Sequence, residues 1–401
     1  MFYAKMAAVF FTIILLIHFK WPLWGAGLIA SLETALFYGI SMPDLLTMAG
    51  TTLVSRSCLE LLFITYGLIL LQNLMERQQM LLKAKDSIAS LCSSEALSAA
   101  VAPAMVGLLP APGSVLIAGS MVRDSCEGKL DTNRMAFITT YFRHIPEALL
   151  PVYTNVILMC AVSRVPEWKF LLFMLPYTLF NAVIPYWIYL RPAASKMEIR
   201  KSAEGPLALL GHLTQNMWPV FLIIFLILAV RIPTALAVLA VILLLFIASR
   251  SFQEAPGLLK KSLDWHMLLM VATILIFTEI LGHTEAPAQL LAGLETLPIP
   301  AFLVYGLIML SGSILSNFTA MIPVVFPAAL AAGSGSLSMT ILLASAGHLA
   351  SQLGPTHICL TLCADQFRTT INRIFLLTFP VTAIMFVLSC GIYVVMRGMG
   401  L

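Results

Sequence analysis

The sequence predicts an all-α polytopic membrane protein with two inverted-topology repeats, each of five transmembrane spans plus one re-entrant hairpin. Of its 401 residues, 60% are hydrophobic and only 10% are charged, whereas soluble domains carry about 25% charged residues. Apolar runs close to the ~20 residues that cross a bilayer recur along most of the chain. A polar stretch, RPAASKMEIRKSAEGP at residues 191–206, divides these runs into two similar sets.

Ten of the apolar runs have the length of transmembrane spans. A first repeat, residues 1–190, and a second repeat, residues 215–401, flank a polar cytoplasmic linker, residues 191–214. The opening run also has the apolar core of a signal peptide, but no clear small-x-small cleavage site follows it, so we predict a span. The predicted spans are 4–19, 22–40, 52–73, 135–162 and 169–190 in the first repeat and 215–230, 232–249, 265–282, 337–363 and 374–396 in the second.

Two further apolar segments, residues 95–122 and 300–332, differ from the spans. Each is interrupted near its centre by Pro, Gly or Asn, which leaves arms of about 13 residues, or about 20 Å of helix. Such an arm is shorter than the ~30 Å hydrocarbon core. We therefore predict two hairpins, each of which enters and leaves the membrane on the same side.

The distribution of Lys and Arg supports this topology, because basic residues are enriched in cytoplasmic loops. With both termini outside, sixteen of the 23 basic residues fall on the cytoplasmic side and five on the outer side, and the remaining two, Arg56 and Arg143, fall within spans. If residues 300–332 formed a single span, Arg368 and Arg373 would move outside. The expected location is the cytoplasmic (inner) membrane.

The two halves carry short related segments. HIPEALLPVYT, from residue 144, and HLASQLGPTHI, from residue 348, each place a proline seven residues after a histidine. The prolines, Pro151 and Pro355, are 204 residues apart, and the hairpin-tip residues Gly107 and Gly312 are 205 apart. This spacing agrees with the predicted repeat, and inverted repeats are common in secondary transporters.

The prolines within the long segments 135–162 and 337–363 have two interpretations. A proline removes a backbone N–H and clashes with the preceding turn, and unwound backbone at membrane depth is tolerated only where it lines protein or a water-filled cavity. The segments are either kinked helices or, as we predict, broken helices that line a site. In GHLASQLGPTHICL, residues 347–360, the predicted substrate-binding side chains are His348, Gln352, Thr356 and His357.

The hairpin tips, LLPAPGS at residues 108–114 and ILSNFTA at residues 314–320, supply short oxygen ligands and helix N-caps. With half-helices that begin at Pro151 and Pro355, four helix N-termini would meet near the membrane centre, and such ends favour an anion. Freed carbonyls and hydroxyls would suit a small cation. The predicted tip residues are Pro112, Gly113, Ser114, Asn317 and Thr319 for the substrate, and Ser316 and Asn317 for a coupling ion.

The first broken segment also carries charge. Arg143 and Glu147 are spaced i,i+4 on one predicted helical face, with His144 beside them. Charged groups within a span cost about 2.5–3.5 kcal/mol each on insertion scales and usually mark pathways. Arg143 either binds an anionic group, together with His144, or neutralises Glu147. A Glu147 carboxylate without a permanent partner is the predicted carrier of a coupling proton.

Taken together, these features resemble the ion transporter superfamily of secondary permeases, which includes gluconate, citrate and dicarboxylate carriers. The similarity covers the whole chain in architecture. LLPAPGS and GPTHICL resemble the motifs of an uncharacterised prokaryotic integral membrane family within that superfamily. The resemblance implies two inverted repeats, a dimeric scaffold and an elevator-like motion. Its sodium symporters carry Ser-Asn-Thr at both tips, which Ser316, Asn317 and Thr319 resemble, whereas the first tip lacks asparagine.

We therefore expect a secondary active transporter for a small anionic organic solute, coupled to H⁺ or Na⁺. The alternatives are a channel or lipid flippase that uses the same site, or an intramembrane hydrolase, although H-E-x-x-H and G-x-S-x-G are absent from the sequence. The seven cysteines form no C-x-x-C, and Cys359 and Cys363 lack nearby ligand partners in the sequence. No metal or cofactor is therefore expected beyond Na⁺ as a coupling ion. No enzyme activity is expected either. The expected partners are the solute, membrane lipid and a second copy of the chain, and no motif implies nucleic acid.

Overall fold

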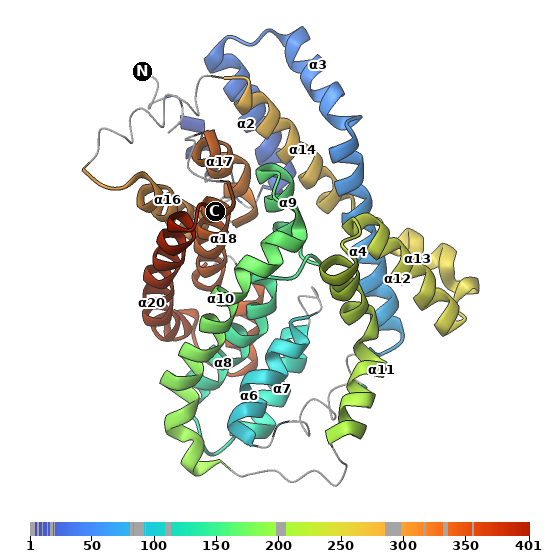
Figure 1. Ribbon diagram of the computed structural model, residues 1–401, viewed down its shortest axis with the longest axis vertical. Helices are drawn as coiled ribbons and strands as arrows, with labels where there is room; N and C mark the ends of the chain where they lie inside the picture. The colour runs from blue at the N-terminus through green and yellow to red at the C-terminus, as the bar shows by residue number, and fades with distance from the viewer. Residues whose placement is uncertain are drawn as a thin grey trace.

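The computed structural model is an elongated bundle of helices (Figure 1). It describes residues 5, 8–9, 11–13, 15–16, 19, 21–80, 83, 92, 94–108, 114–197, 206–284, 298–315, 318–331, 336–354 and 357–401. Within these ranges the regular secondary structure is helical and contains no strand. The all-α prediction is therefore confirmed, while parts of the predicted span 4–19 and of both hairpin tips lie outside the described residues.

Among the described residues, five helical stretches are long and apolar enough to cross a membrane: Arg56–Arg77, Glu167–Lys196, Leu210–Val230, Trp265–Gly282 and Ile371–Gly398. A sixth is obtained if Thr234–Ser249 and Phe252–Lys261, which meet at a bend of 118°, are counted as one. These lengths match the ~20 residues that a bilayer requires, and they indicate a multi-pass membrane protein.

In the first half of the chain the described helices are α2 (Leu23–Tyr38), α3 (Met42–Leu53), α4 (Arg56–Arg77), α6 (Glu95–Val106), α7 (Ser114–Cys126), α8 (Thr132–His144), η1 (Ile145–Ala148), α9 (Thr154–Ser163), α10 (Glu167–Pro185), η2 (Tyr186–Leu190) and η3 (Arg191–Lys196). In the second half they are α11 (Pro206–Phe225), η4 (Leu226–Val230), α12 (Thr234–Ser249), η5 (Phe252–Glu254), α13 (Ala255–Lys261), α14 (Trp265–Gly282), α16 (Ala301–Leu315), α17 (Phe318–Ala331), α18 (Ser336–Leu353), α19 (Ile358–Gln366) and α20 (Ile371–Gly398).

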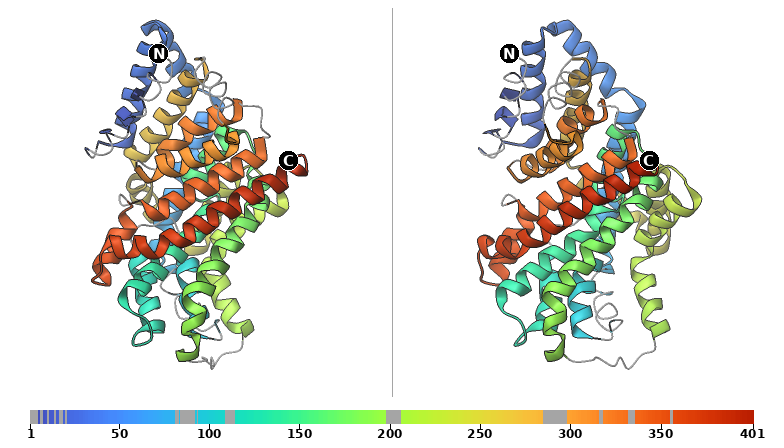
Figure 2. Two further views of the ribbon diagram at one scale, coloured as in Figure 1. Left: turned by 90° about the vertical axis from the view of Figure 1, so that its left-hand side faces the viewer. Right: turned by 60° about the vertical axis from the view of Figure 1, so that its left-hand side comes forward.

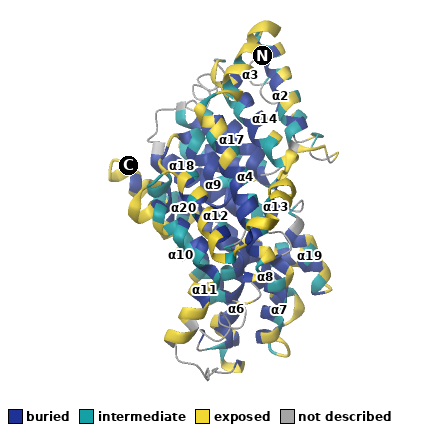
Figure 3. Ribbon diagram, turned by 90° about the vertical axis from the view of Figure 1, so that its right-hand side faces the viewer, coloured by how far each residue is buried: buried dark blue, intermediate teal, exposed yellow. Residues whose placement is uncertain are grey.

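Two pairs of short helices lie toward opposite ends of the molecule (Figure 1). Helices α6 and α7 pack against each other near the lower end in this view, and α16 and α17 pack against each other in the upper half. Helices α10, α18 and α20 run side by side along the same flank (Figure 2). Buried residues concentrate around α4, α9 and α18 in the middle of the bundle (Figure 3).

The helix starts repeat along the chain. Helices α7, α8, α9 and α10 begin at residues 114, 132, 154 and 167, and α17, α18, α19 and α20 begin 204 residues later, at 318, 336, 358 and 371. Contacts repeat as well: Arg143 Nε donates a hydrogen bond to Ser114 Oγ at the start of α7. The Phe318 ring lies against Gly347 in the second half, so closely that a Cβ at Gly347 would meet it. Phe318 is 204 residues after Ser114, and Gly347 is 204 residues after Arg143.

Two predicted segment boundaries were wrong. The span predicted from residue 52 begins instead at Arg56, because Ser55 accepts a hydrogen bond from the Cys58 N–H and caps α4, and residues 42–53 form the separate helix α3. The first broken segment leaves the α-helical conformation at Ile145 rather than at Pro151. Pro146 explains the earlier end, since proline has no N–H to donate to the carbonyl four residues before it and its ring clashes with that carbonyl.

Gly107, at the C-terminus of α6, provides a test of how closely the first helix pair packs against α8. A Cβ at Gly107 would meet the backbone carbonyl of Arg143, which no side-chain rotation can relieve. Gly107→Ala should therefore lower the free energy of unfolding by about 1–3 kcal/mol, measured as a reduced melting temperature in detergent. The control is Gly391→Ala, where a Cβ meets nothing within 4 Å. Equal melting temperatures for the two variants would contradict this packing.

Candidate functional site

A small polar cavity of about 120 Å³ lies where several helices end. Its lining comes from the break after α8, from α9, from the facing ends of α16 and α17, and from the break between α18 and α19. Roughly 300–1,000 Å³ is typical of pockets for drug-sized ligands, so the cavity fits only a small solute. The lining residues are Glu147, Asn155, Ser313, Phe318, Thr319, Ser351, Gly354 and His357.

Three helices present their N-terminal residues to this cavity. Asn155 lies in the first turn of α9, Thr319 lies in the first turn of α17, and His357 is the N-cap of α19. The Nδ1 atom of His357 accepts a hydrogen bond from the Cys359 N–H at 3.3 Å. Helix N-termini carry unsatisfied N–H groups and a partial positive charge, so together they favour an anion in the cavity.

Glu147 gives the cavity a carboxylate. It lies in the 3-10 turn η1, since α8 has already ended at His144. The prediction that Arg143 and Glu147 share one α-helical face was therefore wrong, because Pro146 ends the helix between them. The Oε2 atom of Glu147 lies 3.9 Å from the Nε2 atom of His144. A carboxylate beside an anion is unfavourable unless a proton or a metal cation neutralises it.

Arg143 is buried and contacts the first helix pair instead of lining the cavity. Its Nε atom donates to Ser114 Oγ at 3.1 Å, so two predicted substrate-binding residues lie together. The Tyr153 hydroxyl donates to the carbonyl of Gly107 at the end of α6. These contacts connect the break after α8 to both helices of the pair.

The two repeat-related histidines, His144 and His348, are in direct contact. His348 Nε2 donates to the carbonyl of His144 at 2.8 Å, and because Nδ1 must then act as the acceptor, the Tyr177 hydroxyl donates to it at 2.7 Å. His144 donates its own Nδ1–H to the carbonyl of Thr140. This network satisfies the carbonyl at the point where α8 ends.

Three buried polar atoms near the helix breaks have no hydrogen-bond partner among the described residues: His144 Nε2, Ser313 Oγ and Gln352 Nε2. Ser313 lines the cavity. Leaving such an atom unpaired costs about 1–3 kcal/mol, and in a native protein it calls for an explanation such as a bound ligand or ion. A polar solute or ion in this region would supply the missing partners.

Of the predicted site residues, Glu147, Thr319 and His357 line the cavity. Ser114, Arg143, His144, His348 and Gln352 are buried but do not line it. Pro112, Gly113, Ser316, Asn317 and Thr356 lie outside the described residues.

Sequence reasoning missed Asn155, Ser313, Ser351 and Tyr177. The Thr319 hydroxyl donates to Asn155 Oδ1 and so connects α17 to α9 across the two halves of the chain. Asn155 follows Pro151 in the motif PVYTN, and Ser313 lies three residues before Ser316 in the second predicted hairpin tip. Their positions beside predicted helix breaks could have indicated both residues. No sequence signal marks Tyr177, which lies in the middle of α10.

The structure also brings together three potential metal ligands that the sequence did not connect. His144 from the end of α8 meets His357 and Cys359 from the start of α19, and one ligand atom from each lies within 4.8 Å of the others. The His144 and His357 rings pack edge to face with centroids 4.6 Å apart. Cys363, one helical turn after Cys359, donates to the carbonyl of Ala136.

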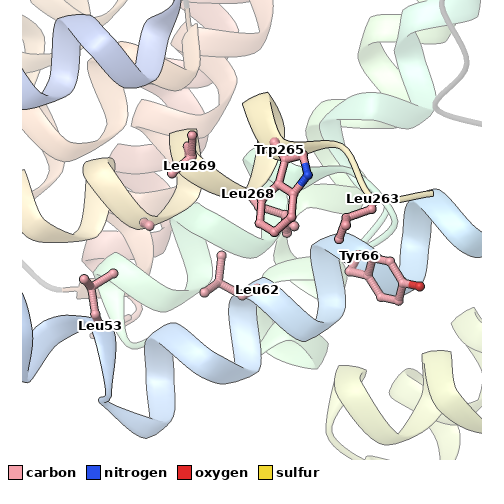
Figure 4. Close-up of a pocket in the computed structure, with 8 residues that line it drawn as sticks. Leu53, Leu62, Tyr66, Leu263, Trp265, Leu268 and Leu269 are labelled. Atoms are coloured by element: carbon pink, nitrogen blue, oxygen red, sulfur yellow. The ribbon is translucent and has the colours of Figure 1, made fainter. Parts of the chain in front are cut away.

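A larger groove of about 390 Å³ lies elsewhere, between α4 and the start of α14 (Figure 4). Leucines dominate its lining, with Tyr66 and Trp265 at one end. The Tyr66 hydroxyl already donates to the carbonyl of Leu259. The groove therefore lacks the convergent polar groups of a solute site.

Tyr177→Phe tests the buried histidine network. The substitution leaves His348 Nδ1 without its donor, so it should lower the free energy of unfolding by about 1–3 kcal/mol, measured from melting temperatures in detergent. Tyr66→Phe is the matched control, because its hydroxyl bonds to a carbonyl at an exposed position, where water replaces the lost donor. A Tyr177→Phe variant as stable as Tyr66→Phe would rule out the network.

Comparison with known proteins adds one finding about ancestry. No curated protein matches the chain significantly. One family model, described as "Protein of unknown function (DUF401)", matches residues 6–396. This match spans nearly the whole chain, including both helix pairs and every residue of the cavity. The chain therefore belongs to the DUF401 family.

Proposed function

We propose that the protein is a secondary active transporter that moves a small anionic organic solute across the cytoplasmic membrane, coupled to H⁺ or Na⁺. The observation that carries this proposal is the polar cavity formed by helix ends. Its lining combines the N-terminal residues of α9, α17 and α19 with the Glu147 carboxylate. In secondary transporters, discontinuous helices provide such ends near the bilayer midplane, where they bind anionic groups and coupling ions.

The repeated helix starts support an inverted repeat. Four successive helices of the second half each begin 204 residues after the corresponding helix of the first half. An odd number of spans per half would insert the halves in opposite directions. The positions of the α6–α7 and α16–α17 pairs toward opposite ends of the molecule (Figure 1) agree with this arrangement. In this proposal both pairs are re-entrant hairpins, as the resemblance to the superfamily of gluconate and citrate permeases implies.

Contacts between the halves support an elevator-like motion. Arg123 on α7 donates to the carbonyl of Gln366 at the end of α19, and Gln366 Nε2 donates back to the carbonyl of Leu116. Thr319 on α17 bonds to Asn155 on α9. Each helix pair is thus connected to the broken helix of the other half, so the four elements would move as one body. The proposed scaffold is a homodimer with both chain termini outside.

Glu147 provides the proposed coupling. An anion attracted by three helix N-termini is repelled by an ionised carboxylate in the same cavity. A proton on Glu147, or Na⁺ beside it, removes this repulsion, so solute and cation would bind and be released together. The buried Arg143 adds a positive charge nearby without lining the cavity.

A thermal-shift screen of the purified protein against small organic acids, with pH and Na⁺ varied, should identify the solute. A ligand that binds the native state raises the melting temperature by mass action, and Asn155→Ala should remove that increase. In proteoliposomes, uptake of the identified acid should stop when the H⁺ and Na⁺ gradients are abolished. Uptake that continues without either gradient would instead indicate a channel or uniporter.

Glu147→Gln tests the coupling group. The amide cannot bind or release a proton, so uptake driven by a pH gradient should fall to the level of protein-free liposomes, while the melting-temperature shift with solute persists. The matched control is Glu279→Gln, since Glu279 is an exposed residue of α14 beside His283. If Glu147→Gln keeps the pH dependence of uptake, this residue is not the proton carrier.

A further inference from the structure

We infer that His144, His357 and Cys359 form a binding site for a divalent transition metal ion of the Zn²⁺ class, beside the polar cavity. One ligand atom from each residue lies within 4.8 Å of the others. Nitrogen and sulfur ligands suit Zn²⁺, which binds at about 2.0–2.1 Å from His nitrogen and about 2.3 Å from Cys sulfur. The three atoms would have to move closer together to share one ion, because two ligands at these distances on a tetrahedral ion lie less than about 4 Å apart.

The tautomer of His144 is already the one that a metal ligand requires. Its Nδ1–H donates to the carbonyl of Thr140, which leaves a lone pair on Nε2. Metal-ligating histidines almost always donate their other ring N–H to a carbonyl or carboxylate in this way. The Nε2 atom is buried and has no hydrogen-bond partner among the described residues, and a metal ion would provide one.

The other two ligands come from one short stretch. His357 and Cys359 lie at the start of α19, and the Cys359 N–H donates to His357 Nδ1 at 3.3 Å. A metal ion at His357 Nε2 would require the other tautomer, with the proton on Nδ1, so this long hydrogen bond would be given up when the metal binds. A metal ion would bind the thiolate of Cys359, because metal binding releases the thiol proton.

When the metal ion is bound, Glu147 is the proposed fourth ligand, so metal and the coupling proton would compete for its carboxylate. Its Oε2 atom is 3.9 Å from His144 Nε2, and structural zinc sites are usually four-coordinate. The carboxylate and the thiolate together balance the two charges of the ion, and this balance offsets repulsion from the neighbouring guanidinium of Arg143. Since Glu147 and His357 also line the cavity, bound metal would change the charge that a solute meets there. The metal site rests on these contacts and not on transport.

The test is metal binding by the purified full-length protein in detergent, first stripped with a chelator and then titrated with Co²⁺ and with Zn²⁺. We expect one ion per chain and, with Co²⁺, a thiolate-to-metal charge-transfer absorption. Cys359→Ser should abolish that absorption and weaken Zn²⁺ binding at least about 100-fold, since even residues that only support ligands contribute 10–100-fold. His357→Ala should weaken Zn²⁺ binding similarly but retain the absorption when Co²⁺ is saturating.

Cys363→Ser is the matched control, because Cys363 lies one turn further along α19 and its thiol bonds to the carbonyl of Ala136. It should bind both metals as the unmodified protein does. Unchanged melting temperatures of the metal-free variants show that the fold is retained. If His357→Ala unfolds, the more conservative Cys359→Ser variant still tests the site. The inference is overturned if the unmodified protein binds neither metal, or if Cys359→Ser binds Zn²⁺ as tightly as Cys363→Ser. Either result leaves the proposed transport unaffected.

Discussion

The structure depends on how backbone polar groups are satisfied where helices end inside a membrane protein. Hydrocarbon offers no hydrogen bonds, so interrupted helices survive only where other parts of the protein supply them. The end of α8 illustrates this constraint, because the carbonyl of His144 is satisfied by the imidazole of His348 from the other half of the chain. Tyr177 in turn fixes the orientation of that imidazole. The break in one half is thus stabilised by a residue at the equivalent position of the other half.

The same constraint explains why the polar cavity lies where it does. Helix ends that meet in one place combine unsatisfied N–H groups, free carbonyls and short polar side chains in a confined space. Contacts between the halves, such as Thr319 with Asn155, hold those ends together. A cavity built this way has an electrostatic preference before any ligand arrives, since N-termini favour negative charge and Glu147 opposes it. In our functional proposal, this conflict between the two charges is the physical basis for coupling a solute to a cation.

The two halves are related but not equivalent at their helix breaks. In the first half, the Arg143 side chain contacts the start of α7 through Ser114. At the corresponding place in the second half, Gly347 leaves room for the ring of Phe318 at the start of α17. The contact is therefore made by a guanidinium from α8 in the first half and by an aromatic ring from α17 in the second. The described lining of the cavity includes residues of the second pair, α16 and α17, and contains no arginine.

The sequence by itself determined the all-helical membrane class and most helix positions, because apolar length and interrupting prolines are local properties of the chain. It also indicated Glu147, Thr319 and His357, which are polar residues beside predicted breaks. Only the tertiary structure decided which of these residues meet. Pro146 ended α8 early and separated Arg143 from Glu147, while residues from distant segments, such as Asn155, Ser313 and Tyr177, joined the site. Such contacts depend on how two halves of the chain pack, and a one-dimensional pattern does not contain that information.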